Sequence, residues 1–262
     1  MIVFAGPSIA GLDPGSIGDF DLRPPVQQGD VYLATRDRPQ AIGIIDGYFE
    51  GAPSVWHKEI LWALTQGIPV FGAASMGALR AAELHAFGMI GIGQIFEAYR
   101  DETLEDDDEV ALLHGPEELG YPQLSLAMVN VRATLDAAQS AQVITQDQAA
   151  WIAGHAKSQF YKTRTWDSVL GTTAPQEIPD PLRQELRGWI DQNEVDQKRI
   201  DAHALLTRLA KGDFETPQPN YHFEETNLWL NATKTWSRPR AAIPEASDEA
   251  YQLFGDCSFL DE

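Results

Sequence analysis

The chain has 262 residues, of which 44% are hydrophobic and 22% charged, enough for one large or two smaller domains with a buried core. Acidic residues outnumber Lys and Arg by 39 to 19, and the net charge of −20 argues against nucleic-acid and anionic-membrane ligands. The single Cys257 excludes a disulfide framework and a cysteine-based zinc site. Because no export signal or long apolar run is visible, we expect a cytoplasmic protein without membrane association.

The first hundred residues predict alternating strands and helices. Short apolar runs bounded by turn residues are typical of buried parallel strands, and they occur at residues 2–5, 31–34, 42–45 and 68–71. A helix is predicted over about 55–65, with Ser54 as N-cap, and another over about 76–87, ended by Gly88. This order predicts a right-handed βαβα unit.

The rest of the chain predicts helices at about 124–141, 145–162, 180–190 and 194–210. Thr145 and Gln148 form a capping box at the start of the second of these. The expected fold is α/β, with an N-terminal parallel-sheet βαβ core and a helical C-terminal region. We expect a core domain at 1–118, a helical region at 119–213, and an extended arm with an acidic tail at 214–262.

A tight turn of small residues joins the fourth predicted strand to its helix. Ser75 lies between Ala73 and Gly77, which is close to the Gly-x-Ser-x-Gly nucleophile elbow with Ala in the first position. Such a turn exposes the serine hydroxyl at the carboxyl edge of the sheet, where the following helix N-terminus favours negative charge. We predict Ser75 as a nucleophile, with Met76 and Gly77 at the anion-binding helix start. A simple N-cap serine fits the same pattern.

A serine nucleophile needs a base, and two candidates begin the helix predicted at 55–65. His57 and Lys58 follow the 42–45 strand, so we expect both at the same sheet edge as Ser75. Lys58 is the better candidate, because a helix N-terminus and apolar neighbours lower a lysine pKa and a neutral lysine accepts a proton. Asp46 either orients Lys58 or caps a turn. A surface Lys58 paired with a glutamate, and a His57 that only packs, are the alternatives.

Two other segments offer binding groups. The sequence Gly6-Pro7-Ser8 ends the first strand and offers a second oxyanion donor or a competing serine, Ser8, but it lacks the Walker lysine and the dinucleotide glycine spacing. The acidic run at 101–109 lacks the alternating ligand spacing of a calcium loop, so we favour a solvated loop or a docking surface for a basic partner over a cation site. No metal site is predicted.

Several segments, in the same order, resemble the TfuA-like family. The two longest and most specific are Ser-Val-Trp-His-Lys-Glu-Ile-Leu at 54–61 and Gly-Ala-Ala-Ser-Met-Gly-Ala-Leu-Arg-Ala at 72–81. The others are Gly6-Pro7-Ser8, Gly29-Asp30-Val31, and residues 44–49, 88–93 and 107–110. Residues 125–135 and Asp196-Gln197-Lys198 also resemble the family, but less distinctively. The resemblance covers about residues 1 to 115, whereas the last fifty residues match nothing.

The resemblance implies a role beside a YcaO enzyme, which uses ATP to activate a backbone amide of a precursor peptide for thioamide formation. A TfuA-like partner is understood to hydrolyse the C-terminal thiocarboxylate of a ThiS-like sulfur-carrier protein, releasing sulfide, and to help YcaO engage the peptide. The family's Ser–Lys pair implies Ser75 and Lys58 here. Arg80 or the helix N-terminus would offset the charge of the thiocarboxylate. No metal or organic cofactor is implied.

Two other functions fit the sequence. In the first, the protein is a non-catalytic adaptor that recruits peptide or sulfur carrier to YcaO, and Ser75 is only a cap. In the second, it is an unrelated small-molecule hydrolase on an α/β scaffold, which would turn over simple esters without a protein partner.

Overall fold

The computed structural model describes residues 1–171 and 178–237. The chain divides into two compact units, Met1–Glu224 and Glu225–Glu262, which are treated separately below. The first unit contains a five-stranded, all-parallel sheet in the order β2-β1-β3-β4-β5. Its strands are β1 (Ile2–Phe4), β2 (Asp21–Arg23), β3 (Ile42–Ile44), β4 (Val70–Gly72) and β5 (Ile90–Gly91).

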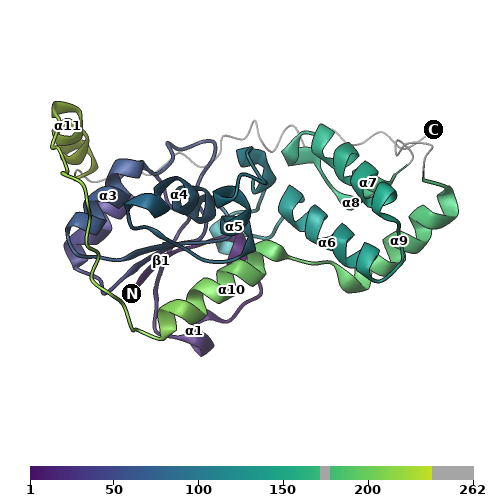
Figure 1. Ribbon diagram of the computed structural model, residues 1–262, viewed down its shortest axis with the longest axis horizontal. Helices are drawn as coiled ribbons and strands as arrows, with labels where there is room; N and C mark the ends of the chain where they lie inside the picture. Colours follow the sequence, from purple (N-terminus) through teal and green to yellow (C-terminus); the bar gives the residue numbers. More distant parts are fainter. Residues whose placement is uncertain (172–177, 238–262) are drawn as a thin grey trace. The chain divides into compact units, whose positions relative to one another are not determined.

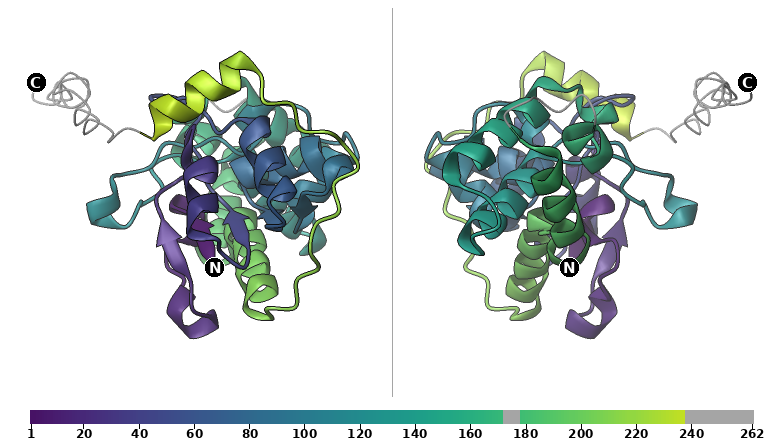
Figure 2. Two further views of the ribbon diagram at one scale, coloured as in Figure 1. Left: turned by 90° about the vertical axis from the view of Figure 1, so that its left-hand side faces the viewer. Right: turned by 90° about the vertical axis from the view of Figure 1, so that its right-hand side faces the viewer.

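Helices cover both faces of this sheet (Figure 1). On one face lie α3 (His57–Thr65), α4 (Met76–Leu84) and α5 (Gln94–Arg100), and on the other lies α10 (Gln197–Ala210). Successive strand residues point to opposite faces, so Phe4 and Ile44 pack in the core under α3–α5, whereas Val3 packs with Leu205 and Leu209 of α10. Figure 2 shows α10, in green, running along the sheet.

The helical region of the first unit has its own apolar core, formed by α6 (Met128–Ser140), α7 (Gln146–Ser158), α8 (Trp166–Leu170) and α9 (Asp180–Asn193). Two short helices, α1 (Pro14–Ile17) and α2 (Asp30–Ala34), lie in the loops of the sheet half. The second unit contains α11 (Asn227–Trp236), in which Trp229 and Trp236 are buried. Among the described residues, no helix is long and apolar enough to cross a bilayer.

The predicted α/β class is confirmed, as are three of the four predicted strands. The prediction of a strand at 31–34 is wrong, because this segment is α2, which starts after Gly29 in a left-handed conformation (φ 92°). The sheet instead gains β2, an edge strand with exposed Asp21 and Leu22, whose polar sequence carries little strand signal. The expected Ser54 cap is also wrong, since α3 starts after Trp56 and the Ser54 hydroxyl donates to the Tyr48 carbonyl (2.9 Å).

In the second half the predicted helices exist, with changed ends. The capping box of Thr145 and Gln148 is confirmed at the start of α7. The segment after α10 runs without regular structure along the sheet half, where the Tyr221 hydroxyl donates to the Leu61 carbonyl (2.8 Å). The predicted arm is interrupted by α11, whose first turn is capped by the Thr226 hydroxyl, an acceptor for the Trp229 N–H (3.3 Å). The acidic tail from residue 238 lies outside the described residues.

Candidate active site

A cavity of about 390 Å³ lies at the carboxyl ends of β1, β3 and β4. This is the edge at which parallel α/β sheets bind ligands. Loops at the ends of the strands and the segment at 110–114 supply most of the wall, and the turn before α8 and the first turn of α10 supply the rest. The lining residues are Pro7, Pro25, Asp46, Gly47, Tyr48, Phe49, Glu50, Gly51, Ser75, Val110, Leu112, Leu113, His114, Tyr161, Lys162 and Lys198.

Ser75 reaches this cavity from a strained turn between β4 and α4. Its N–H donates to the carbonyl of Ala73 (2.8 Å), which closes a three-residue γ-turn around Ala74. Ala74 has φ of 66°, a value that costs energy for a residue with a Cβ, and such strain concentrates at functional sites. Ser75 is 2% exposed, and it stands at the N-cap position of α4 without a side-chain capping bond. Within the described residues the Ser75 hydroxyl forms no hydrogen bond, which weakens the interpretation as a cap.

Lys198 reaches the same cavity from the other side of the sheet. It lies in the first turn of α10, is 1% exposed, and donates from Nζ to the Val110 carbonyl (2.7 Å). Burial lowers the pKa of Lys198, while the charges of Asp46 and Asp196 oppose this effect. A lysine with a lowered pKa spends more of its time neutral at ordinary pH, so it can accept a proton.

Asp46 holds the loop after β1 in place. Its Oδ2 accepts the N–H groups of Gly6 (2.9 Å) and Ser8 (3.0 Å), and its Oδ1 accepts the Ser8 hydroxyl (2.7 Å). The carboxylate also lines the cavity, where its charge acts on Lys198. The structure therefore places Asp46 next to the loop at 6–8 and to Lys198, rather than beside Lys58. Because the Ser8 hydroxyl is already donated to a buried carboxylate, Ser8 is the weaker candidate nucleophile.

The backbone donors predicted to bind an oxyanion are not all free. The Gly77 N–H donates to the Ile45 carbonyl (3.2 Å), and the loop at 6–8 donates its amides to Asp46 as described above. The Met76 N–H follows Ser75 at the start of α4 and has no acceptor among the described residues. Of the predicted donors, Met76 therefore stays available.

The structure does not bring Lys58, His57 or Arg80 to the cavity wall. Lys58 Nζ lies 5.1 Å from the ring centre of Phe223, on the segment that follows α10. His57 Nε2 lies 2.7 Å from Glu83 Oε2, and Arg80 donates to the same carboxylate (2.7 Å). These contacts join the first residue of α3 to the C-terminal half of α4.

Residue spacing in the sequence already indicates that Lys198 is buried. Four, seven and eleven residues after Lys198 stand Ala202, Leu205 and Leu209, which form the buried face of α10. A lysine in line with that face is unusual, since lysines are rarely fully buried. The same position belongs to the Asp196-Gln197-Lys198 segment that resembles the TfuA-like family.

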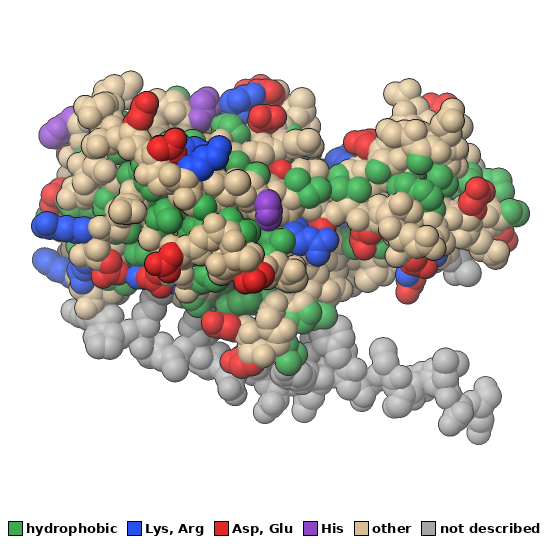
Figure 3. Space-filling model, turned by 90° about the horizontal axis from the view of Figure 1, so that it is seen from below, with side chains coloured by type: hydrophobic (Ala, Val, Ile, Leu, Met, Phe, Trp, Pro, Cys, Tyr) green, Lys and Arg blue, Asp and Glu red, His purple; other side chains and the backbone are tan. Residues whose placement is uncertain are grey.

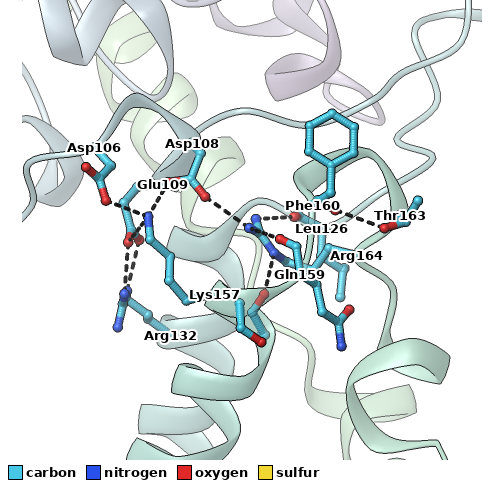
Figure 4. Close-up of polar contacts among 12 residues, drawn as sticks. Asp106, Asp108, Glu109, Leu126, Arg132, Lys157, Gln159, Phe160, Thr163 and Arg164 are labelled. Atoms are coloured by element: carbon cyan, nitrogen blue, oxygen red, sulfur yellow. Dashed lines mark hydrogen bonds and ion pairs between the residues drawn. The ribbon is translucent and has the colours of Figure 1, made fainter. Parts of the chain in front are cut away.

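Part of the acidic run forms an ion-pair cluster with the helical region (Figure 4). Glu109 is held by Arg132 (2.8 and 2.9 Å) and by Lys157 (3.0 Å), and Lys157 also contacts Asp106 (3.1 Å) and Asp108. The buried Arg164 pairs with Asp108 as well (3.1 Å) and donates to three backbone carbonyls. These acids bind basic side chains of the same chain. The expectation of a solvated loop is therefore wrong for Glu109, which is buried, whereas Asp106 is exposed and Asp108 partly so. Other acidic side chains are dispersed over the face seen in Figure 3.

Comparison with known protein families finds a match to the part of the chain that includes several cavity residues. The sequence model of the family described as TfuA-like protein matches residues 46–165, from Asp46 at the cavity to the end of the ion-pair cluster. This part of the chain is therefore similar to TfuA-like proteins. No match was found among curated proteins. The match to the TfuA-like model includes Ser75, whereas Lys198 lies beyond it.

Proposed function

We propose that this protein is a TfuA-like serine hydrolase that releases sulfide from a thiocarboxylated ThiS-like sulfur carrier for YcaO-dependent thioamidation of a precursor peptide. The observation that carries the proposal is the cavity shared by Ser75 and Lys198. Ser75 has a hydroxyl without a hydrogen-bond partner in the described chain, and Lys198 has a pKa lowered by burial. These are the two properties that a Ser–Lys pair requires.

The chemistry follows from this pair. Neutral Lys198 accepts the proton of the Ser75 hydroxyl while Oγ forms a bond to the thiocarboxylate carbon, and negative charge develops on the carbonyl oxygen near the Met76 N–H. The C–S bond then breaks, and the sulfur leaves as hydrosulfide with the proton from Lys198. Water attacks the resulting acyl-serine, which returns Ser75 and leaves the carrier with a carboxylate.

The base in this proposal is Lys198, where the sequence favoured Lys58. Lys198 lines the cavity and is fully buried, whereas Lys58 is half-buried against Phe223 and does not line it. The position of Lys198 in the first turn of α10 disfavours its charged form further, since a helix N-terminus repels a cation. Asp46 opposes these effects and keeps the lysine able to hold the proton between the two steps.

The experiment is sulfide release from thiocarboxylated carrier by the native protein and by Ser75→Ala, Lys198→Met and Lys58→Met. We expect both Ser75→Ala and Lys198→Met to lose about 10³-fold or more of the rate, as removal of a nucleophile or its base does in serine hydrolases. Lys58→Met removes a lysine outside the cavity and is the matched control, for which we expect native activity. Circular dichroism and urea unfolding of each variant show whether it is folded.

The outcomes separate the candidate functions. Undiminished release by Ser75→Ala would refute the serine mechanism, and intact thioamidation with that variant would favour the non-catalytic adaptor. Loss of activity in Lys58→Met with full activity in Lys198→Met would return the role of base to Lys58. Turnover of simple esters together with inertness toward thiocarboxylated carrier would favour a small-molecule hydrolase.

A further inference from the structure

We propose that the backbone N–H of Gly47 is the second oxyanion donor of this site and acts together with the N–H of Met76. The inference rests on the proposed function, because an oxyanion forms only if Ser75 attacks a carbonyl carbon. It assigns a catalytic contact to a residue that follows β3, the strand next to the one that carries Ser75.

The hydrogen bonds on either side of Gly47 fix the direction of its N–H. The Asp46 carbonyl accepts the Val26 N–H (2.9 Å), and the Tyr48 N–H donates to the Val26 carbonyl (3.2 Å), so Gly47 is bridged to Val26 as in a parallel sheet. In an extended chain, the backbone groups of successive residues point alternately to the two sides. The N–H of Gly47 must therefore point away from Val26.

Ser75 and Met76 lie on the side to which that N–H points. The end of β3 pairs there with the chain after β4: the Ala73 N–H donates to the Ile44 carbonyl (3.1 Å), and the Gly77 N–H donates to the Ile45 carbonyl (3.2 Å). Gly47 and Ser75 both line the cavity. A Cβ added at Gly47 would lie 2.7 and 2.8 Å from Met76 Cγ and Cβ, which places the two residues in direct contact.

The Gly47 N–H is also available. It donates to no acceptor within the described parts of the chain, whereas the amides of Gly6, Ser8 and Gly77 are all engaged. Nucleophile elbows commonly take one oxyanion donor from the residue after the serine and a second from a loop of a neighbouring strand. Met76 supplies the first of these donors and Gly47 has the position of the second, while a side chain at Gly47 would push Met76 out of place.

The first test uses the native chain and a fluorophosphonate, which forms a tetrahedral, oxyanion-like adduct on an active serine. The sequence contains a single Asp-Gly step, Asp46-Gly47, so labelling Asp with ¹³C at the carbonyl and Gly with ¹⁵N isolates the Gly47 amide in an HNCO spectrum. We expect its proton to shift downfield when Ser75 is modified, as a new hydrogen bond to the adduct forms. An unshifted Gly47 proton in the fully modified protein would overturn the inference.

The second test replaces the Gly47 amide by an ester, which removes the N–H without adding a Cβ. A synthetic segment 1–51 is ligated at Gly51 to residues 52–262 carrying Ala52→Cys, and the all-amide ligated chain is the reference. The control is the same ester at Ile42, which removes a strand hydrogen bond to Pro69 (3.0 Å) far from the cavity. Both esters weaken one carbonyl acceptor, at Asp46 or at Ala41, so they match in that respect.

We expect the Gly47 ester to slow modification of Ser75 by about 10²- to 10³-fold, the usual effect of losing one oxyanion donor, with little change in urea unfolding. The Ile42 ester should unfold at lower urea concentration but react at the reference rate. Equal rates for the Gly47 ester and the reference would refute the role of Gly47 and leave the hydrolase standing. Failure of the reference chain itself to react at Ser75 would instead refute the proposed function, and the inference with it.

Discussion

The buried carboxylate of Glu59 makes the stability of this protein depend on pH. Glu59 is fully buried on α3, where its oxygens accept the N–H groups of Trp56 (3.0 Å) and Tyr32 (3.3 Å), joining the start of α3 to α2. Burial raises the pKa of Glu59 from 4.5 to about 7, while the backbone donors, including Gly29, act in the opposite direction. The carboxyl group is therefore partly protonated at neutral pH.

Proton binding to Glu59 determines whether the free energy of unfolding rises or falls with pH. Between pH 4.5 and 7 the folded state holds a proton on Glu59 that the unfolded state has lost, so the free energy of unfolding falls as the pH rises through this window. At about 1.4 kcal/mol for each pH unit, the shift to about 7 corresponds to about 3 kcal/mol of stability that is present below pH 4.5 and lost above pH 7. Glu59→Gln cannot titrate and removes this dependence.

The assay is the free energy of unfolding from urea titrations at pH 5, 6, 7 and 8 for the native protein and Glu59→Gln. The native value minus the variant value should fall by about 2 to 3 kcal/mol between pH 5 and 8. Glu83→Gln is a control: burial acts to raise the pKa of Glu83, but contacts with His57 and Arg80 outweigh it and lower this pKa from 4.5. The contribution of Glu83 is lost only on acidification below the assay range, so the difference for this variant should stay nearly constant between pH 5 and 8. A flat or rising difference for Glu59 would refute the assignment of its raised pKa.

Three further predictions test the site and its frame. The rate of sulfide release should increase with pH, and the midpoint of this increase should lie below 10.5, the ordinary pKa of lysine. Asp46→Asn should move the midpoint lower because Asp46 raises the pKa of Lys198, and a midpoint that stays in place would contradict this coupling. Arg164→Met should lower the free energy of unfolding by about 3 kcal/mol or more, because it leaves buried acceptors unpaired, and urea titration measures it. Gly77→Ala should lower the free energy of unfolding by about 3 kcal/mol, since the added Cβ would overlap the Ile44 carbonyl oxygen. A variant with a near-native free energy of unfolding would show that α4 can move.

The fold was largely predictable where burial sets the sequence pattern. Apolar runs between turn residues located β1, β3 and β4, since strands covered on both faces contain little else. Residues 31–34 read the same way and are helical, because a run of four apolar residues has no period that separates strand from helix. The polar edge strand β2 was missed because its position depends on pairing with β1 and not on its own residues.

The site was predictable only where its residues share one local motif. The turn around Ser75 is encoded by adjacent small residues, and the structure places Ser75 in the cavity. Lys58 drew attention because it lies in a distinctive segment, but the buried residue of that segment is its neighbour Glu59, which joins α2 to α3. Lys198 comes from α10, on the opposite face of the sheet, and no local pattern connects it to Ser75.

The position of Lys198 explains why the helix on the far face of the sheet matters to the proposed chemistry. The body of α10 covers that face with Leu205 and Leu209, while its first turn reaches the carboxyl edge of the sheet, where the cavity lies. The apolar packing that holds α10 in place therefore also keeps Lys198 out of water, and burial is the main cause of its lowered pKa. A substitution that loosens α10, such as Leu205→Ala, should then raise the pKa of Lys198 toward that of a solvated lysine. The activity of a still-folded variant should fall most at neutral pH and least at high pH.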